Sequence, residues 1–546
     1  MLSITVKCNN QKMTYPKGVS LLEVSKDFQS EFKSKILIGK VNGILTELSV
    51  NLFNNVEVEF YDKLSTTGNK VYESGLLYVL SLAFKEVFNS DIIVRYSLDT
   101  GIYIKSPVLI SSNDLDVVKT KMNEMIKADL PIDKLLINRK EAIKYYDRVG
   151  EEDKKDILKY NTNTNVNLYK LNNTYDYFFN NLPISTGYLE EFKLTLIDRN
   201  SFVITYPNVY TSKLVYKHHE KLYTAFKEYD EWCNTVGVDS ICDLNDKVTE
   251  GNINDYIFLS EAYQNNNLYD IAKQISDDKD IKIVLISGPS SSGKTTTSKK
   301  LQLFLRAFGI SPKTLSIDDY FVDREKTPKK EDGTYDFESI RAVKLEQFNK
   351  DLTKLLNGDK VKVPTYNFVL GRGEYINDPI DLKKNEILII EGLHALNNEL
   401  TSSIPKKNKF KIYLAPLTVL NLDNHNRIKT TDVRILRRII RDNRTRGYDA
   451  KESLESWERV REGEEKNVFP FQDEADVIFN TTLLYELGAL KVYAEPLLYK
   501  VSENDDCYKD AIRLLNLLKN VLPIPSDCIP RDSIIREFIG DGYFKI

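Results

Sequence analysis

The feature that most constrains this chain is the stretch Gly288-Pro-Ser-Ser-Ser-Gly-Lys-Thr-Thr-Thr-Ser-Lys-Lys300, which fits the phosphate-binding pattern G-x-x-x-x-G-K-[ST]. A run typical of a buried strand, residues 281–286, precedes it, and residues 294–308 have a helical pattern that stops at Gly309. The glycine-rich turn therefore falls between a strand end and a helix start, where free backbone N–H groups and the helix dipole favour an anion. A Gly/Ser loop that holds no ligand is the alternative interpretation.

The motif also predicts which residues contact the nucleotide that donates the phosphate. Lys294 can reach the β- and γ-phosphates of a nucleotide, and the Thr295 hydroxyl can ligate Mg²⁺. The predicted ATP contacts in this stretch are Gly288, Ser290, Ser291, Ser292, Gly293, Lys294, Thr295 and Thr296.

Length and composition narrow the class of protein. With 546 residues the chain is too long for one core and suggests three or four domains. A formal net charge of −4 argues against a general nucleic-acid coat. The five Cys form no CxxC pair, which favours a reducing compartment. No apolar run approaches the roughly 18 residues of a membrane span and the start lacks a signal peptide, so we expect a cytoplasmic protein without membrane contact.

Residue patterns divide the chain into five segments. Residues 1–61 alternate like short strands around one helix behind Ser20, as in a β-grasp module. Residues 62–200 mix helices and strands and predict a separate α+β domain. Residues 201–280 are expected to be a helical connector with a turn at Asn265-Asn-Asn267.

The C-terminal half has a different pattern. Residues 281–505 alternate strands and helices, which predicts an α/β fold with a parallel sheet and helices on both faces. Residues 506–546 form a tail with an amphipathic helix at 508–518. The end of this tail, residues 529–540, is expected either to dock on the preceding domain or to be a plain surface helix.

Two acidic positions follow predicted strands of the α/β domain. Asp318 and Asp319 come directly after a strand at 313–317, at the edge where open α/β sheets bind ligands. A carboxylate there can accept a hydroxyl proton or hold a metal through water, and a solvated Asp-Asp turn is the alternative. Glu391 ends the apolar run 386–390, where a Walker-B carboxylate belongs, and is the natural second Mg²⁺ partner.

A basic stretch follows at residues 432–447, which contain six Arg. Arg434, Arg437 or Arg438, and Arg441 share one helical face, and three interpretations compete. The stretch is a solvated basic helix, a nucleic-acid contact, or a lid that closes on transferred phosphate. A phosphate-binding loop in the same domain favours the lid, because planar Arg donors suit the charge of a transferring phosphoryl group.

These pieces together carry a family resemblance. Residues 281–500 resemble the uridine kinase and phosphoribulokinase branch of P-loop kinases, which implies ATP-dependent, Mg²⁺-assisted transfer of a phosphoryl group to a nucleoside 5′-hydroxyl. The matching phrases are GPSSSGKTT, SIDDYF (316–321), YDFES (335–339), PTYNF (364–368), IIEGLHAL (389–396), RRIIRDNRTRG (437–447) and EADVIFN (474–480).

The resemblance implies roles for individual residues. Asp318 activates the 5′-hydroxyl and takes part in metal binding, Asp336 holds the ribose hydroxyls, Tyr366 packs the nucleoside, and Glu391 binds Mg²⁺ with Thr295. Arg438 faces the substrate, while Arg441 and Arg446 contact ATP, with Asp318, Lys294 and Arg441 as the catalytic set.

Two departures concern the base. Uridine-cytidine kinases carry a base-reading His where this chain has Leu370-Gly-Arg-Gly373, and a base-reading Gln near Glu455-Ser-Trp457. Ribose recognition is therefore expected, whereas the base that is accepted stays open. His394 and His425 match neither position, and a structural or surface role is expected for both.

The N-terminal half has its own resemblance. Residues 1–61 resemble a TGS domain, and residues 62–200 resemble the second additional, editing-type domain of threonyl-tRNA synthetase, through phrases such as Asp99-Thr-Gly-Ile-Tyr103 and the stretch 182–193. The His pair of the editing site falls here on Ser74 and Tyr78, and residues 176–182 hold neither Cys nor His. The resemblance thus implies the fold without editing chemistry, kept for binding or regulation.

Two functional hypotheses follow. The first is an ATP-dependent nucleoside kinase whose partners are a nucleoside and ATP. The second is an RNA- or ribosome-associated P-loop NTPase, in which the N-terminal domains contact RNA; the missing guanine motif NKxD speaks against a GTPase. A kinase for a non-nucleoside alcohol fits YDFES and PTYNF less well, and a homo-oligomer is compatible with either hypothesis.

Overall fold

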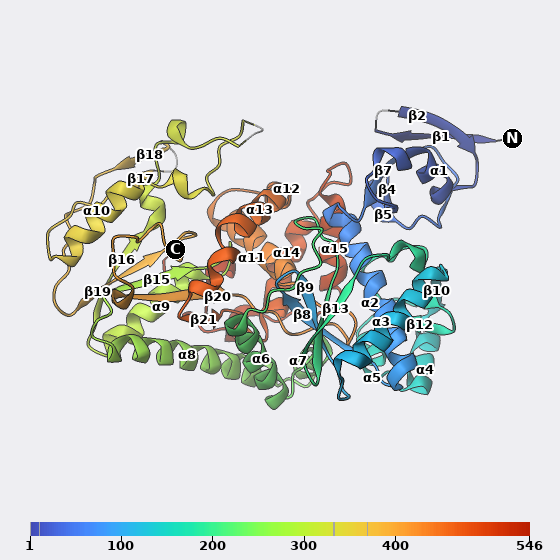
Figure 1. The fold of residues 1–546 in the computed structure, drawn as a ribbon, viewed down its shortest axis with the longest axis horizontal. Helices are drawn as coiled ribbons and strands as arrows, with labels where there is room; N and C mark the ends of the chain where they lie inside the picture. The colour runs from blue at the N-terminus through green and yellow to red at the C-terminus, as the bar shows by residue number, and fades with distance from the viewer. Residues whose placement is uncertain (1, 10, 331–332, 368–369, 546) are drawn as a thin grey trace.

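The computed structural model describes residues 2–9, 11–330, 333–367 and 370–545, and Figure 1 shows their arrangement. The N-terminal modules lie at one end of the molecule and the parallel sheet of the C-terminal half at the other; α6 (Glu220–Thr235) and α7 (Ile241–Thr249) lie between them, and α8 (Ile253–Asp277) runs along the sheet. Among the described residues, no helix is long and apolar enough to cross a membrane.

The first segment is built on a five-stranded sheet in the order β2-β1-β7-β4-β5. The helix expected behind Ser20 is present as α1 (Leu21–Phe28), and Ser20 and Glu23 form a reciprocal capping box at its start. The strands are β1 (Ser3–Cys8), β2 (Gln11–Pro16), β4 (Ile36–Val41), β5 (Ile44–Thr46) and β7 (Val56–Asp62), with the short pair β3 (Val19–Ser20) and β6 (Asn51–Leu52).

The second segment packs helices against two antiparallel sheets, in the orders β13-β14-β9-β8 and β10-β11-β12. Its first helix, α2, begins at Thr66, where the Ser65 side chain accepts from the Gly68 N–H as the N-cap. The elements are α2 (Thr66–Phe88), β8 (Ile93–Leu98), β9 (Gly101–Lys105), α3 (Ser112–Lys127), β10 (Ile132–Asn138), α4 (Arg139–Val149), α5 (Glu152–Lys159), β11 (Asn165–Leu171), β12 (Thr174–Asp176), β13 (Lys193–Asp198) and β14 (Ser201–Thr205).

The connector holds three helices, α6 (Glu220–Thr235), α7 (Ile241–Thr249) and α8 (Ile253–Asp277). The predicted turn at residues 265–267 is wrong, because these residues lie inside α8. Gln264, Leu268 and Ile271 continue one buried stripe through this point, and the Gln264 amide donates to the carbonyl oxygens of Asn480 and Thr482. A buried helical face outweighs the turn preference of three Asn residues.

The C-terminal half contains a five-stranded sheet in the order β16-β19-β15-β20-β21, and all its pairs are parallel. Val284 and Ile286 of β15 pack with α8 and α9, whereas Ile283 and Leu285 share a core with α10, α11 and α14. The predicted α/β fold with helices on both faces is confirmed. The bounds are β15 (Ile283–Ser287), α9 (Lys294–Ala307), β16 (Ser311–Ser316), α10 (Leu345–Leu356), β19 (Glu386–Glu391), β20 (Lys409–Ala415), α11 (Thr430–Thr445), β21 (Val477–Asn480) and α14 (Glu486–Leu498).

The remaining elements are short or C-terminal. Strands β17 (Thr365–Asn367) and β18 (Arg372–Glu374) form a hairpin, and α12 (Ala450–Glu455) and α13 (Trp457–Asn467) follow the basic helix α11. Helix α15 (Tyr508–Leu518) has the bounds that the sequence predicted, and α16 (Arg536–Ile539) is a single turn. The bounds of the five predicted domains stay a prediction.

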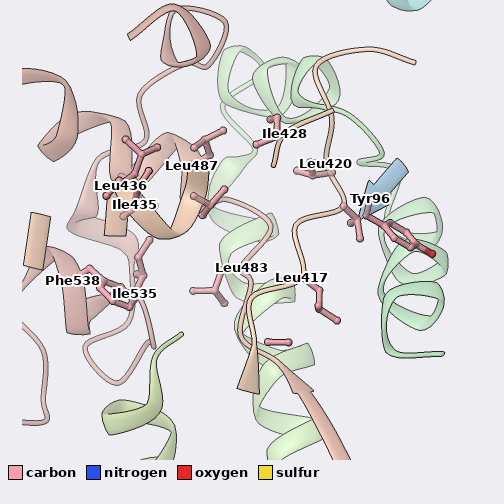
Figure 2. Close-up of a cluster of buried hydrophobic side chains, with 14 of the residues drawn as sticks. Tyr96, Leu417, Leu420, Ile428, Ile435, Leu436, Leu483, Leu487, Ile535 and Phe538 are labelled. Atoms are coloured by element: carbon pink, nitrogen blue, oxygen red, sulfur yellow. The ribbon is translucent and has the colours of Figure 1, made fainter. Parts of the chain in front are cut away.

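A loop of the C-terminal half, residues 416–429, is inserted into the second segment. Asn421 donates to the Val94 carbonyl at 2.8 Å, and the Val94 N–H donates to the Asn424 carbonyl at 2.8 Å. Figure 2 shows the apolar side of this junction, where Tyr96, Leu417, Leu420 and Ile428 belong to one buried cluster with residues of α11. The two halves therefore share a core.

Charged side chains are buried in the same junction. His425 donates from Nδ1 to Asp176 at 2.6 Å and from Nε2 to Asp91 at 3.0 Å. Lys154 lies between Asp176, at 2.7 Å, and Asp423, at 2.9 Å. Burial alone would lower the pKa of His425, but Asp91 and Asp176 outweigh it and raise this pKa to about 10. The structural role expected for His425 is confirmed.

We predict that replacing His425 destabilises the protein. His425→Leu removes the cation that Asp91 and Asp176 share and leaves each with a single Lys, Lys85 or Lys154, so we expect a loss of about 3 kcal/mol in the free energy of unfolding by urea at pH 7. Because the folded pKa is raised above the unfolded value, the contribution is complete below about pH 6.5 and disappears as pH rises through about 10. The difference between variant and wild type should therefore shrink between these values. The exposed His218 gives the control variant His218→Leu, and equal losses in both variants would contradict the prediction.

Candidate active site

The phosphate-binding loop has the strand-turn-helix geometry that the sequence predicted. Strand β15 ends at Ser287 and α9 begins at Lys294, with Gly293 between them at a φ of +83°. Only glycine adopts this left-handed backbone at little cost. Lys294 Nζ folds over the loop and donates to the carbonyl oxygens of Gly288 at 2.8 Å and Pro289 at 3.0 Å.

Several hydroxyl groups of the loop are buried but unsatisfied. Those of Ser291, Ser292 and Thr296 have no hydrogen-bond partner among the residues that the structure describes. Buried donors without a partner are costly, and they cluster here around the N-terminus of α9. This arrangement fits a bound phosphate, which would accept from these groups.

Two acidic side chains lie at the same edge of the sheet as the loop. Glu391 is the last residue of β19 and stands in register with Ile286 of β15 and Ser316 of β16, so Asp318 follows close by. Burial raises the pKa of Glu391 to about 7, opposed by Lys294. Asp318 reaches solvent, yet the protein around it displaces enough water to raise its pKa, against the pull of Lys294.

This set of oxygens fits Mg²⁺. Within the described ranges no group of three or more His, Cys, Asp or Glu could hold a metal ion by itself. Mg²⁺ commonly takes one or two carboxylates and completes its shell with waters and substrate phosphates. Glu391 and Asp318, with the half-buried Thr295 in the first turn of α9, supply that number of protein ligands.

The YDFES stretch contributes residues on the expected acceptor side. Asp336 is half-buried, and the buried His394 lies near it, with a pKa that burial lowers to about 4. Glu338 was not predicted as a site residue, although it belongs to the same motif. Its burial and the nearby Glu464 raise its pKa to about 7, and it interacts with Arg438 and Asp318.

The positions expected to contact the base are largely packed against protein. Tyr366 in β17 is buried, its ring lies edge-on at 5.7 Å from Phe321, and its N–H donates to Asp319 at 3.1 Å. Trp457 lies under the Arg434 guanidinium, 5.2 Å from the ring centre, while Leu370 is exposed. Phe368 of the PTYNF motif lies outside the described residues.

The basic helix α11 contains two kinds of Arg. Arg434 and Arg437 are buried and support the phosphate-binding loop. They donate to the carbonyl oxygens of Ser290 at 3.0 Å and Ser291 at 3.3 Å. Glu464 pairs with Arg434, and Glu486 pairs with Arg437. The interpretation of a solvated basic helix is wrong for these two residues.

The three Arg that the family resemblance selected converge elsewhere. Arg438, Arg441 and Arg446 approach Asp442 at 3.2, 2.8 and 3.5 Å, and Arg438 also donates to the Ser290 hydroxyl at 3.1 Å. Arg446 is exposed and attracts the Asp318 carboxylate. The structure thus brings these three side chains to the side of the loop that faces Asp318, and their roles stay predictions.

Two carboxylates that the sequence did not indicate accept from the loop itself. Glu464 accepts from the Ser290 N–H at 2.7 Å, and Glu537 accepts from the Thr296 N–H at 3.0 Å. Glu464 comes from α13 and Glu537 from the C-terminal segment, neither of which carries a motif at that point. Of the two alternatives for that segment, docking on the preceding domain is confirmed.

The positions that correspond to an editing site are filled by packing. Ser74 and Tyr78 are both buried in α2, and the Tyr78 hydroxyl donates to the carbonyl oxygens of Tyr169 at 3.0 Å and Thr174 at 2.9 Å. The rings of Tyr78 and Phe178 lie 5.3 Å apart. Two aromatic side chains therefore take up this space.

Comparisons with known proteins assign different relatives to the two halves. Residues 283–484 match the Phosphoribulokinase / Uridine kinase family. The N-terminal part is similar to threonine–tRNA ligases: that of Carboxydothermus hydrogenoformans is 26% identical over 190 residues, 34% of this chain, and that of Ehrlichia canis 30% over 193 residues, 35% of this chain. The chain spans only 30% of the length of each of these relatives.

Solved structures with detectable similarity were also found. A possible uridine kinase from Bacillus stearothermophilus is 19% identical, with a TM-score of 0.25. The aligned part covers 37% of this chain and 89% of the other chain. A D-glycerate 3-kinase from Cryptococcus neoformans var. grubii is 14% identical, with a TM-score of 0.18. Here the aligned part covers 46% of this chain and 80% of the other chain.

We predict that Arg434 is needed for folding. Arg434→Leu leaves the buried Glu464 carboxylate with Arg461 as its remaining cation and removes a hydrogen bond to the loop, so we expect a loss of about 3 kcal/mol in the free energy of unfolding by urea. The exposed Arg446 on the same stretch provides the control, and Arg446→Leu should change this free energy by less than about 0.5 kcal/mol. Similar losses for both variants would show that Arg434 has no special structural role.

Proposed function

We propose that the protein is an ATP-dependent nucleoside kinase, because residues 283–484 match the Phosphoribulokinase / Uridine kinase family, which supports a P-loop kinase. It transfers the γ-phosphoryl group to a nucleoside 5′-hydroxyl and releases ADP and a nucleoside monophosphate. The observation that carries the proposal is the placement of Asp318. Its carboxylate follows β16 at the sheet edge that holds the loop, within the electrostatic reach of Lys294 and Arg446.

In this proposal Asp318 takes the proton of the 5′-hydroxyl. The hydroxyl oxygen forms a bond to the γ-phosphorus while the bond from that phosphorus to the bridging oxygen breaks, so ADP leaves with the electron pair. A raised pKa makes Asp318 a better proton acceptor than an ordinary surface Asp. Lys294 and Arg441 offset the negative charge that spreads over the transferring group.

The loop would hold the nucleotide through its backbone N–H groups and its unpaired hydroxyls. Thr295, Glu391 and Asp318 would hold Mg²⁺, which when bound neutralises charge on the β- and γ-phosphates. Arg446 would add a further contact to ATP.

On the acceptor side, Asp336 would hold the ribose hydroxyls, Tyr366 would pack the nucleoside, and Arg438 would face the substrate. The base is not assigned to pyrimidines, because Gly371 and Trp457 occupy the regions where a His and a Gln would read the base, and Trp457 is stacked under Arg434. The substrate is therefore proposed as a nucleoside without a stated base.

For the N-terminal half we propose binding or regulation without editing chemistry. The aromatic packing of Tyr78 on Phe178 supports this proposal, since it fills the place where the editing side chains would stand. The first segment is proposed to be a TGS domain on the strength of its β-grasp sheet.

A second candidate is an RNA- or ribosome-associated P-loop NTPase. The similarity of the N-terminal part to threonine–tRNA ligases favours it. Such a protein would hydrolyse its nucleotide without a nucleoside acceptor, and it would not need a proton-accepting carboxylate beside Lys294.

We predict that Asp318→Asn lowers kcat of phosphoryl transfer by about 10²–10⁴-fold, while affinity for the nucleotide in the absence of Mg²⁺ changes little. Transfer is measured with ATP labelled in the γ-phosphate against a panel of nucleosides, and affinity by equilibrium titration. Asp319→Asn is the matched control: this carboxylate accepts from the Tyr366 N–H instead, so the loss should be far smaller.

Two outcomes would contradict this assignment. Unchanged transfer by Asp318→Asn would remove Asp318 as the base. ATP hydrolysis that RNA stimulates, without transfer to any nucleoside, would favour the second candidate.

A further inference from the structure

The C-terminal segment, residues 529–545, folds back against the phosphate-binding loop. Ile534, Ile535 and Phe538 are buried, at 1%, 0% and 0% exposure. Figure 2 shows Ile535 and Phe538 on the side of α11 that carries Ile435 and Leu436. Ile534 touches the loop itself, since a Cβ added at Gly293 would lie 2.7 Å from its Cγ2 atom. The end of the chain is therefore part of the wall around the loop.

One carboxylate of this segment reaches the phosphate-binding groups. Glu537 Oε2 accepts from the Thr296 N–H at 3.0 Å, and Thr296 lies in the first turn of α9, where N–H groups lack helical partners. Glu537 also attracts the Lys294 ammonium and repels the Glu391 carboxylate. A single side chain thus interacts with the loop N–H, the loop Lys and the expected metal ligand.

The segment is fastened by the elements that surround the loop. Arg444 of α11 donates to the Glu537 carbonyl at 2.8 Å, and the Arg437 guanidinium lies 5.0 Å from the centre of the Phe538 ring. Lys299 of α9 donates to the carbonyl oxygen of Lys545. These contacts fix the backbone at Glu537. The fixed backbone directs the Glu537 carboxylate toward the Thr296 N–H, so charge attraction is not the only cause of this contact.

A phosphate and this carboxylate compete for the same groups. The first N–H groups of a helix that follows a glycine-rich loop bind anions, and one of them here already has an anionic partner. A triphosphate brought into the loop would meet Glu537 as well as Glu391, two negative charges that repel it. Since one N–H cannot serve both anions well, the loop accepts either the carboxylate or the phosphate.

We propose that the C-terminal segment is an internal competitor of nucleotide, in which Glu537 takes a phosphate position at the Thr296 N–H and must leave before ATP binds fully. The inference rests on the proposed function in one respect, namely that the loop binds nucleotide. Apparent affinity is then the intrinsic affinity reduced by the fraction of molecules whose segment is released. Anything that holds or frees residues 529–545 would change kinase activity without touching the catalytic residues.

The first test compares nucleotide binding by three forms of the full-length chain. Mg²⁺ and a fluorescent, non-hydrolysable ATP analogue are titrated with wild type, Glu537→Gln and the control Asp541→Asn, which removes an exposed carboxylate from the same segment. We expect Glu537→Gln to bind the analogue roughly tenfold more tightly than wild type, the equivalent of one charged hydrogen bond. Asp541→Asn should bind like wild type.

The second test uses wild type alone and so does not depend on how a variant folds. Hydrogen exchange of residues 529–545 is measured with and without the Mg²⁺-bound analogue, and we expect faster exchange when the analogue is bound. A segment that stays protected while the analogue binds would overturn the inference. So would equal or weaker binding by Glu537→Gln, which would make the segment a component of the nucleotide site.

The outcomes separate this inference from the proposed function. If wild type and Glu537→Gln bind the analogue equally, the loop is a nucleotide site and only the competition is refuted. If neither form binds it at any concentration, or if both bind it as well as a Lys294→Ala variant does, the loop is not a nucleotide site and both proposals fail.

Discussion

The structure depends on a set of charges buried between its two halves. Asp91, His425, Asp176, Lys154 and Asp423 form, in this order, a chain of hydrogen-bonded pairs in a junction that apolar side chains close off. Such a set is stable only when every charge has its partner, because desolvation makes an unpaired member very costly. The His425 loop leads directly into α11, whose Arg434 and Arg437 hold the carbonyl oxygens of the phosphate-binding loop. The geometry of the loop is thus connected, through one helix, to the N-terminal half.

In the candidate active site, by contrast, some charged and polar groups lack a full set of partners in the part of the chain that the structure describes. Glu391 and Glu338 have pKa values raised to about 7, chiefly by burial, and loop hydroxyls lack partners among the described residues. These groups become satisfied when cations and phosphates are added, whereas those of the junction are satisfied already. The charges of the junction therefore stabilise the contact between the two halves, whereas those of the site remain available for a ligand.

Local patterns made much of this visible in the sequence. The G-x-x-x-x-G-K-[ST] turn, Asp318 after one strand and Glu391 at the end of another are each encoded within a few residues, and parallel pairing then places them at one edge. Contacts over long separations were not encoded in this way. Glu537 and Thr296 are 241 residues apart, and His425 and Asp176 are 249 apart, so no spacing rule connects them. The three Asn of α8 show the converse, since a local turn preference lost to a buried face formed with distant residues.

The insertion of residues 416–429 into the second segment has a consequence for how such a chain arose and how it can be altered. A kinase region expressed alone would expose His425, Asn421 and the apolar side chains around them. The remaining half would lose the loop 416–429 that fills part of its interior. The two parts are therefore not independent domains joined by a linker. Exchanging either part for that of another protein would therefore require matched changes on both surfaces of the junction.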